Sequence, residues 1–309
     1  MRRFTPLTPM TRPMTTYLPN LHAVLGNPVE HSQSPRIHAL FAAQCGLSLR
    51  YERRLLATDG FVNGLLAFRA ENGRGCNVTV PFKFEAARAA RRLSPRATLA
   101  EAANTLGWDD DGELWGDNTD GIGLVRDLAR VLTHASASSQ EPHADAPPLT
   151  GKTVLLLGAG GAASGVLGAL IVAGAQAIAV WNRNAGKARL LVARHAEIAD
   201  EHGVALTAVS ESAPGFDLVI NATASSLSGA TLELPRDVLR PGILAYDLMY
   251  AAQATAFVAQ AREAGAEAQD GLGMLVEQAA ESFWLWHGVR PDTAPVLATL
   301  LAERRGRSH

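Results

Sequence analysis

The stretch from Thr153 to Gly165 constrains the fold of this chain more than any other part of the sequence. It opens with an uninterrupted apolar run, Val154 to Leu157, which has the length of a β-strand buried on both faces. The run leads directly into residues 158–163, Gly-Ala-Gly-Gly-Ala-Ala, which match the pattern G-x-G-x-x-A. A helix rich in small residues is predicted to follow from Ala162 to Ala173 and to stop at Gly174.

This order of strand, glycine-rich turn and helix is typical of a dinucleotide-binding site. Glycines let the backbone approach a pyrophosphate, which then accepts hydrogen bonds from the free N–H groups at the helix start. The residues predicted to contact the pyrophosphate are consecutive: Gly158, Ala159, Gly160, Gly161 and Ala162. A purely structural turn is the alternative, because glycine-rich turns are common, but the flanking strand and helix favour the cofactor site.

The end of the next predicted strand, Ala177 to Trp181, indicates which cofactor binds. A site for NAD usually places Asp or Glu here on the ribose hydroxyls, and an acid would repel a 2′-phosphate. This chain instead has Asn182 and Arg183 at that point, with Lys187 shortly after. Because a guanidinium fits a phosphate dianion bidentately, the sequence predicts NADP. The alternative is that Arg183 only solvates the strand end.

The composition is that of an ordinary globular protein and excludes several classes of function. The length of 309 residues suggests roughly two domains of ~150 residues. The net charge of −2 gives no attraction toward nucleic acid or an anionic membrane surface. No apolar run approaches the ~18 residues that a membrane span needs. Residues 1–20 are rich in Pro and Thr, and we expect them to form a disordered tail.

The two cysteines, Cys45 and Cys76, form no C-x-x-C pair and are too few for a disulfide framework. We expect both to be reduced thiols in or near the core of a cytoplasmic protein. No His, Cys or acidic cluster has metal-ligand spacing, so no metal is predicted. Residues 134–150, rich in Ser, Pro and Ala, lack periodicity and are predicted to form a flexible loop.

The first candidate for binding an anion follows a short predicted strand, Leu21 to Leu25. There, Ser32 and Ser34 precede Pro35 and a helix predicted from Arg36 to Cys45. Ser34 could simply cap this helix, with Pro35 at its first position. The other interpretation is that both hydroxyls project toward a small anionic group. The residues alone leave this choice open.

Lys83 is the second candidate. A strand is predicted from Gly75 to Val80, and Pro81 is predicted at the first position of the next helix. Lys83 would then lie in the first helical turn at the carboxyl end of a strand, where α/β sheets build their sites. A cation opposes the helix dipole there, which suggests a positional role, although a solvated lysine explains it as well.

A third group surrounds Asp120, which precedes a helix with apolar residues at Leu124, Leu128 and Leu132. Asp120 could be only the N-cap of this helix.

Towards the C-terminus, strands are predicted at 218–222, 243–248 and 267–269, followed by a helix from Met274 to His287. Gln278 lies four residues after Met274 and therefore on the same helix face. The aromatic residues of that helix, Phe283, Trp284 and Trp286, are predicted to pack in the core or between domains.

Together these stretches closely resemble the quinate/shikimate dehydrogenase family from about Ala23 to Gly288. The resemblance is carried by eight segments in the family's order, at residues 26–38, 77–83, 103–106, 116–124, 157–163, 181–184, 246–250 and 270–280. Several ordered motifs are far more specific than any single one. One departure is Asn184, where the family usually has Thr or Ser.

The resemblance implies an α/β fold in which a cleft separates an N-terminal α/β substrate domain from a doubly wound, Rossmann-type NADP-binding domain. The substrate domain would comprise residues 21–120 and 272–309, and the NADP-binding domain residues 121–271. By the same resemblance, Lys83 and Asp120 would be the catalytic pair. Ser32 and Ser34 would hold the substrate carboxylate. The other residues implied to bind the substrate are Asn77, Thr79, Asn104, Tyr250 and Gln278.

The resemblance also extends the implied cofactor site. Asn182, Arg183 and Lys187 would surround the 2′-phosphate. The residues implied around the remainder of the cofactor are Thr223, Leu248, Gly271 and Met274. The implied activity is the NADP-dependent, reversible reduction of 3-dehydroshikimate to shikimate by a monomer or homodimer.

Two alternatives remain open. One is a quinate/shikimate dehydrogenase that uses NAD, and the other is a non-catalytic regulatory protein that binds a cofactor on the same fold. The presence of both Lys83 and Asp120 favours an enzyme.

Overall fold

The computed structural model describes residues 20–135, 147–210, 215–223, 234 and 238–306. Nearly all of the tail predicted at residues 1–20, and most of the loop predicted at 134–150, therefore lie outside the described residues. The predicted loop is also too long at both ends. Helix α5 (Asp120–Ala135) includes its first two residues, and Leu149 near its end is fully buried in the core.

The N-terminal part is built on a six-stranded mixed sheet with the order β2-β1-β3-β5-β6-β4. Its parallel pairs are β2/β1, β1/β3 and β6/β4, whereas β3/β5 and β5/β6 are antiparallel. The strands are β1 (Asn20–Gly26), β2 (Leu49–Leu55), β3 (Gly73–Val78), β4 (Arg92–Leu93), β5 (Thr105–Trp108) and β6 (Leu114–Asp117). The helices between them are α1 (Ser34–Cys45), α2 (Phe61–Ala70), α3 (Lys83–Ala89) and α4 (Pro95–Ala100).

The second sheet also has six strands, all parallel, in the order β12-β11-β10-β7-β8-β9. The strand order reverses at β7: β8 and β9 lie on one side of it, and β10, β11 and β12 lie on the other. This is the doubly wound topology that the sequence predicted. Its strands are β7 (Thr153–Leu157), β8 (Ala177–Trp181), β9 (Ala205–Val209), β10 (Leu218–Asn221), β11 (Leu244–Asp247) and β12 (Glu267–Gln269). Its helices are α6 (Gly161–Val172), α7 (Ala185–Arg194), α8 (Ala196–Glu201) and α9 (Ala256–Glu263).

Strand β7 is buried on both faces, as its apolar run predicted. Val154 and Leu156 pack into the cluster beneath α5 and α6, whereas Leu155 and Leu157 pack into a second cluster with Phe257 of α9. All four strand residues are fully buried. Since parallel sheets are covered by helices on both sides, this is the pattern expected of a central strand.

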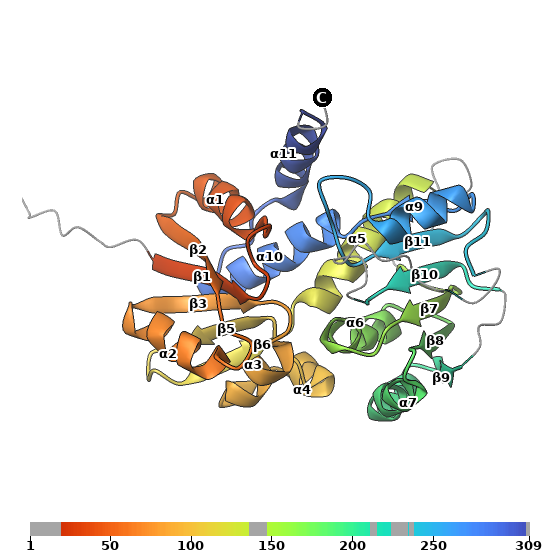
Figure 1. Cartoon of the computed structure of the whole chain (residues 1–309), viewed down its shortest axis with the longest axis horizontal. Helices are drawn as coiled ribbons and strands as arrows, with labels where there is room; N and C mark the ends of the chain where they lie inside the picture. Colours follow the sequence, from red (N-terminus) through yellow and green to blue (C-terminus); the bar gives the residue numbers. More distant parts are fainter. Residues whose placement is uncertain (1–19, 136–146, 211–214, 224–233, 235–237, 307–309) are drawn as a thin grey trace, which may run out of the picture.

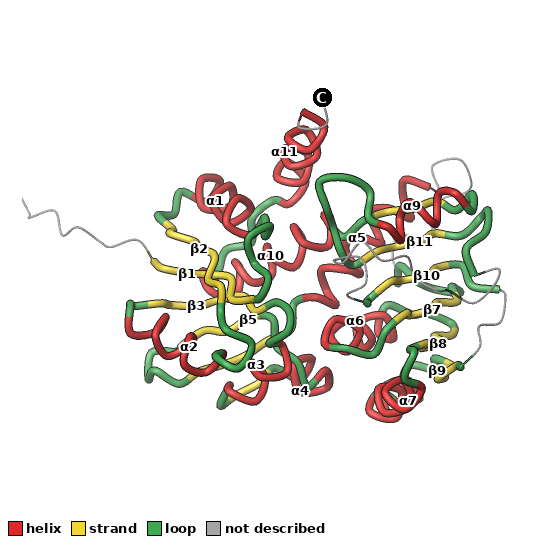
Figure 2. Tube along the Cα trace, viewed as in Figure 1, coloured by secondary structure: helices red, strands yellow, loops and turns green. Residues whose placement is uncertain are grey.

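Helix α5 and helix α10 (Leu272–His287) run between the two sheets, and the last helix, α11 (Thr293–Gly306), projects from the same region (Figures 1 and 2). The two central helices approach closely at Gly123. A Cβ atom on Gly123 would lie 2.6 Å from Cβ and 2.8 Å from the backbone nitrogen of Gln278. Only glycine therefore fits this crossing.

Several local predictions need correction. Strands β5 and β6 were not predicted from the sequence. Phe283 is fully buried and Trp286 is partly buried, but the predicted packing of Trp284 is wrong, because this residue is 45% exposed. Cys76 is buried and Cys45 partly buried, both as free thiols, as predicted. Among the described residues, no helix combines the length and hydropathy needed to cross a membrane.

Candidate active site

A cavity of about 770 Å³ lies where the carboxyl ends of β1, β3 and β11 face the first half of α10. Every residue predicted for catalysis or substrate binding lines it: Ser32, Ser34, Asn77, Thr79, Lys83, Asn104, Asp120, Tyr250 and Gln278. Four residues predicted for the cofactor line it as well: Ala162, Leu248, Gly271 and Met274. Residues from both sheets thus meet in one cavity.

Lys83 and Asp120 form an ion pair in the wall of this cavity. The Lys83 Nζ lies 2.5 Å from Asp120 Oδ2, and their side chains are 14% and 7% exposed. The second carboxylate oxygen, Oδ1, accepts a hydrogen bond of 2.8 Å from Asn104 Nδ2. Both carboxylate oxygens are therefore held, and the ammonium group has a fixed partner.

The helix starts differ by a residue or two from those predicted. Helix α3 begins at Lys83 after Phe82, so Pro81 precedes the cap and is not at the first helical position. Asp120 is the first residue of α5 and not its cap. Its backbone N–H donates to Asn118 Oδ1 at 3.1 Å. The capping explanation of Asp120 is therefore wrong, and its carboxylate is free to face Lys83.

Asn77 has its amide orientation fixed by its neighbours. Its Nδ2 donates to the backbone oxygen of Asn104 at 3.2 Å and to Ser282 Oγ at 3.0 Å. Because a backbone oxygen can only accept, this side of the amide must be the nitrogen. Asn77 Oδ1 accepts a hydrogen bond of 2.6 Å from the Tyr51 hydroxyl and has a second lone pair left for a ligand hydroxyl.

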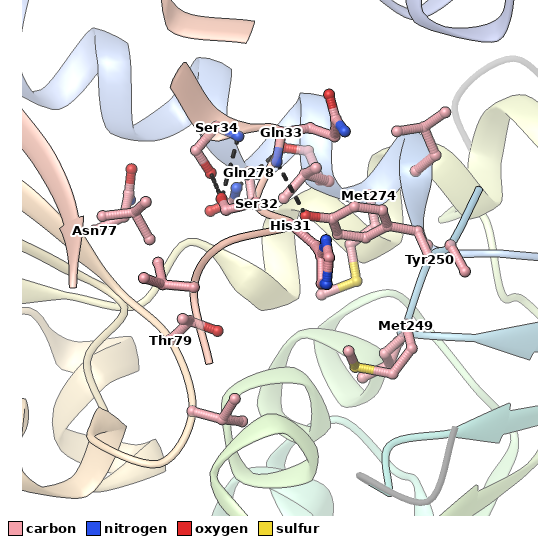
Figure 3. A pocket seen from close by; sticks show the side chains of 18 of the residues that line it. His31, Ser32, Gln33, Ser34, Asn77, Thr79, Met249, Tyr250, Met274 and Gln278 are labelled. Atoms are coloured by element: carbon pink, nitrogen blue, oxygen red, sulfur yellow. Dashed lines mark hydrogen bonds between the residues drawn. The ribbon is translucent and has the colours of Figure 1, made fainter. Parts of the chain in front are cut away.

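The two serines lie on the loop between β1 and α1 and point toward each other (Figure 3). Ser32 Oγ donates to Ser34 Oγ at 3.1 Å. Helix α1 begins at Ser34 with Gln33 as its cap, so the alternative in which Ser34 caps the helix is wrong. The backbone N–H of Gln33 donates to the Tyr250 hydroxyl at 3.3 Å, which joins this loop to the chain that follows β11. Burial raises the pKa of Tyr250, so its phenol is neutral at physiological pH.

The glycine-rich turn between β7 and α6 lies against the first sheet's catalytic candidates. Gly158 has a φ of 114°, and a Cβ there would lie 3.0 Å from the backbone oxygen of Ala222. A Cβ on Gly161 would lie 3.4 Å from the Cβ of Lys83. Helix α6 runs from Gly161 to Val172, one residue earlier at each end than the predicted helix, and ends before Gly174. Its free N–H groups therefore lie close to the end of the cavity that holds Lys83.

The remaining cofactor candidates lie outside the cavity, along the carboxyl ends of the second sheet. They are Gly158, Ala159, Gly160, Gly161, Asn182, Arg183, Lys187 and Thr223. Arg183 and Lys187 are exposed at the start of α7, where Asn184 caps the helix and accepts a hydrogen bond of 3.3 Å from the Lys187 backbone N–H. Thr223 donates its hydroxyl to Asn221 Oδ1 at 2.7 Å.

Gly271 shows how closely the second sheet approaches α10. A Cβ there would lie 2.3 Å from the backbone oxygen of Leu248, so a larger residue would push β11 and α10 apart. The sequence did not single out Arg53, which also lines the cavity, and Met249, which lines it too, was noted only as part of the segment 246–250. The alternation along β2 places Arg53 on the same face as Tyr51, but it does not say which face of the strand meets the cavity. Within the described ranges, no group of three or more His, Cys, Asp or Glu side chains could hold a metal ion.

Three family models match separate parts of this chain. The family model of the shikimate dehydrogenase substrate binding domain matches residues 24–106. The model named shikimate / quinate 5-dehydrogenase matches residues 141–239, and that of the shikimate 5′-dehydrogenase C-terminal domain matches residues 271–301.

Individual relatives match along nearly the whole chain. The shikimate dehydrogenase (NADP(+)) of Verminephrobacter eiseniae is 53% identical, over 91% of this chain and 94% of its own. The crystal structure of an Ael1 enzyme from Pseudomonas putida is 41% identical, with a TM-score of 0.75 over 91% of this chain and 98% of its own. Shikimate 5-dehydrogenase from Thermus thermophilus, solved with NADP(H) and shikimate, is 32% identical, with a TM-score of 0.72 over 94% of this chain and 100% of its own. The motifs, the two sheets and these matches show that the chain belongs to the shikimate dehydrogenase family.

Proposed function

We propose that this protein catalyses the NADP-dependent, reversible reduction of 3-dehydroshikimate to shikimate. The observation that carries the proposal is the Lys83–Asp120 pair in a cavity that also contains two facing serines and several fixed amides. We further propose that it works in the cytoplasm as a monomer or homodimer, with no nucleic-acid or membrane partner.

The polar groups of the cavity suit a small polyhydroxylated acid. Ser32 and Ser34 would hold the carboxylate, since each hydroxyl can turn its proton toward an anion. Asn77 Oδ1 would accept from one ring hydroxyl through its remaining lone pair. We assign Thr79, Asn104, Tyr250 and Gln278 to the ring hydroxyls and the frame of the pocket.

Lys83 would act on the proton at the reacting oxygen. Reduction of a carbonyl creates an alkoxide, which must take up a proton, and the Lys83 ammonium faces the cavity with a proton to give. Asp120 holds this ammonium group in place by accepting its hydrogen bond, and Asn104 in turn fixes the Asp120 carboxylate. In the reverse direction Lys83 Nζ would take the proton back.

The residues of the second sheet fit NADP. The glycine turn offers backbone N–H groups where side chains would block an approaching pyrophosphate, and the exposed Arg183 and Lys187 offer positive charge with no acid between Trp181 and Lys187. Asn182 would complete the 2′-phosphate site, and Thr223, Leu248, Gly271 and Met274 would border the rest of the cofactor. When bound, NADPH supplies the hydride.

Steady-state kinetics of the purified protein test the proposal. Shikimate and quinate are each oxidised with NADP⁺ and with NAD⁺, and the four values of kcat/KM are compared. We expect shikimate with NADP⁺ to give the highest value. A higher value with quinate or NAD⁺ would support the alternative dehydrogenase. No turnover of any pair, with NADPH still bound, would support a regulatory protein.

A further inference from the structure

Strand β2 presents different charges on its two faces, because successive side chains of a strand point in opposite directions. On one face Glu52 pairs with Arg50 and with Arg54, and Arg54 also pairs with Glu71 at 2.6 Å. On the other face lie Tyr51, which contacts Asn77, and Arg53. The charges of the first face are therefore compensated by neighbours.

Arg53 differs from the two other arginines in what it contacts. Its Nε and Nη2 donate to the backbone oxygen of Ser32 at 2.9 and 2.7 Å. This bond fixes the loop that carries the predicted carboxylate-binding serines, and Arg53 lines the cavity itself. In the part of the chain that the structure describes, no carboxylate forms an ion pair with Arg53.

The other cationic side chains that line the cavity are already paired. Lys83 pairs with Asp120, and Arg304 of α11 pairs with Asp270. Arg53 is close enough to act on the site, since its charge lowers the pKa of the Tyr250 phenol against the larger, raising effect of burial. The phenol of Tyr250 accepts the N–H of Gln33, the residue between the two serines.

A carboxylate beside Ser32 and Ser34 needs more than hydroxyl groups. Hydroxyls can donate hydrogen bonds, but they supply no opposite charge, and an unpaired charge in a partly buried site is costly. A guanidinium has five N–H donors in a fixed plane, of which Arg53 uses two on Ser32. Arg53 therefore keeps N–H donors that Ser32 does not use, and the bond to Ser32 holds its charge next to the loop of the two serines.

We propose that Arg53 is a specificity-determining residue that makes this site select anionic substrates, by supplying the counter-charge for the carboxylate and anchoring the loop that binds it. This inference rests on the proposed function, because it takes the substrate to be a carboxylic acid held at Ser32 and Ser34.

The test compares shikimate with its neutral methyl ester as substrates, each oxidised with NADP⁺. The proteins are wild type, Arg53→Met, Arg53→Lys and the control Arg50→Met, which removes an exposed arginine of the same strand outside the cavity. The readout is the ratio of the two KM values, ester over acid. Loss of the loop anchor raises both KM values together, whereas loss of the charge raises only that of the acid.

In Arg53→Met we expect the KM of shikimate to rise by about fivefold to tenfold more than the KM of the ester, so the ratio falls by the same factor. This is the range between the effect of an exposed ion pair and that of a hydrogen bond to a charged group. Arg53→Lys should keep most of the wild-type ratio, and Arg50→Met should keep all of it. Added salt should lower the wild-type ratio toward that of Arg53→Met.

An unchanged ratio in Arg53→Met would overturn the proposal, whether both KM values rise or neither does. If wild type oxidises shikimate and the ratio does not change, Arg53 alone has been misassigned. If wild type does not oxidise shikimate at all, the proposed function fails, and the role of Arg53 fails with it.

Discussion

Lys83 and Asp120 are each the first residue of a helix, α3 and α5, and their charged atoms lie 2.5 Å apart. The start of a helix favours Asp and disfavours Lys, so the carboxylate offsets the unfavourable position of the ammonium group. The pair therefore holds a cation where the helix alone would repel it.

Replacing Lys83 by Ala should lower kcat by about 100-fold or more, the lower range for loss of a general acid–base group. The KM of shikimate should change little, because the serines and amides that bind it remain. Steady-state kinetics decide this, with Lys152→Ala as the control at an exposed lysine of the second sheet. Turnover within a few-fold of wild type would remove Lys83 from the mechanism.

Replacing Ser32 or Ser34 by Ala should mainly raise the KM of shikimate. Each hydroxyl lost is a hydrogen bond to a charged group, which contributes about 1.5–3 kcal/mol, or roughly tenfold or more in KM. The KM of NADP⁺ should stay the same and serves as the internal control. If both serines can be replaced without raising the KM of shikimate, the carboxylate binds elsewhere.

Replacing Arg183 by Ala should raise the KM of NADPH by about 10- to 100-fold and leave that of NADH nearly unchanged. Arg183 is exposed and, within the described residues, has no acidic partner, so its charge is available to a 2′-phosphate. Arg74→Ala, at an exposed arginine of β3 in the first sheet, is the matched control. An equal rise in the KM of NADPH and of NADH would mean that Arg183 supports the turn and does not bind the phosphate.

The stability of the protein should fall as the pH drops below about 6.5, the pKa of a histidine in an unfolded chain. Burial, together with His287, lowers the pKa of His22 to about 3, and burial with its histidine neighbours lowers that of His38 far below its usual value. As the pH falls, the unfolded chain therefore binds protons at two histidines that stay neutral in the folded chain. Each such histidine should lower the free energy of unfolding by up to about 1.4 kcal/mol for every pH unit below about 6.5.

The free energy of unfolding, measured by urea denaturation between about pH 7 and pH 5, tests this expectation. His38→Phe keeps a ring in the stack that His38 forms with Tyr51, 4.2 Å between ring centroids, but cannot titrate. The free energy of unfolding of this variant should depend on pH less steeply than that of wild type, because one fewer histidine titrates. An unchanged slope in His38→Phe would contradict the assignment.

The sequence predicted the first strand, turn and helix of the second sheet almost to the residue. The run 154–157, the turn after it and helix α6 were predicted to within a residue, because strand, turn and helix signals agreed. Strands β5 and β6 were missed because each contains a glycine, which weakens a strand signal. The glycine of β5 fits its partner strand, because Gly107 lies directly opposite Trp115 and the ring of Trp115 fills the space above it.

The site was predicted mainly through family motifs, since the residues alone left each candidate open. Ser34 obeys the rules for a helix cap, and only the surrounding fold decides that it starts the helix instead. Arg53 was missed for a similar reason. It stands in the run Arg50 to Arg54, where four of five residues are charged, and only the sheet assigns it to the cavity face.

The tight crossing of α5 and α10 at Gly123 has a consequence for how such a site can evolve. Met274 and Gln278 both line the cavity and lie one turn apart on α10, about 6 Å along its axis. A side chain at position 123 would collide with Gln278 itself, so it would displace this turn of α10 and, because a helix is stiff over one turn, both cavity side chains with it. A substitution at Gly123, which does not itself line the cavity, would therefore change the cavity wall at Met274 and Gln278 at once.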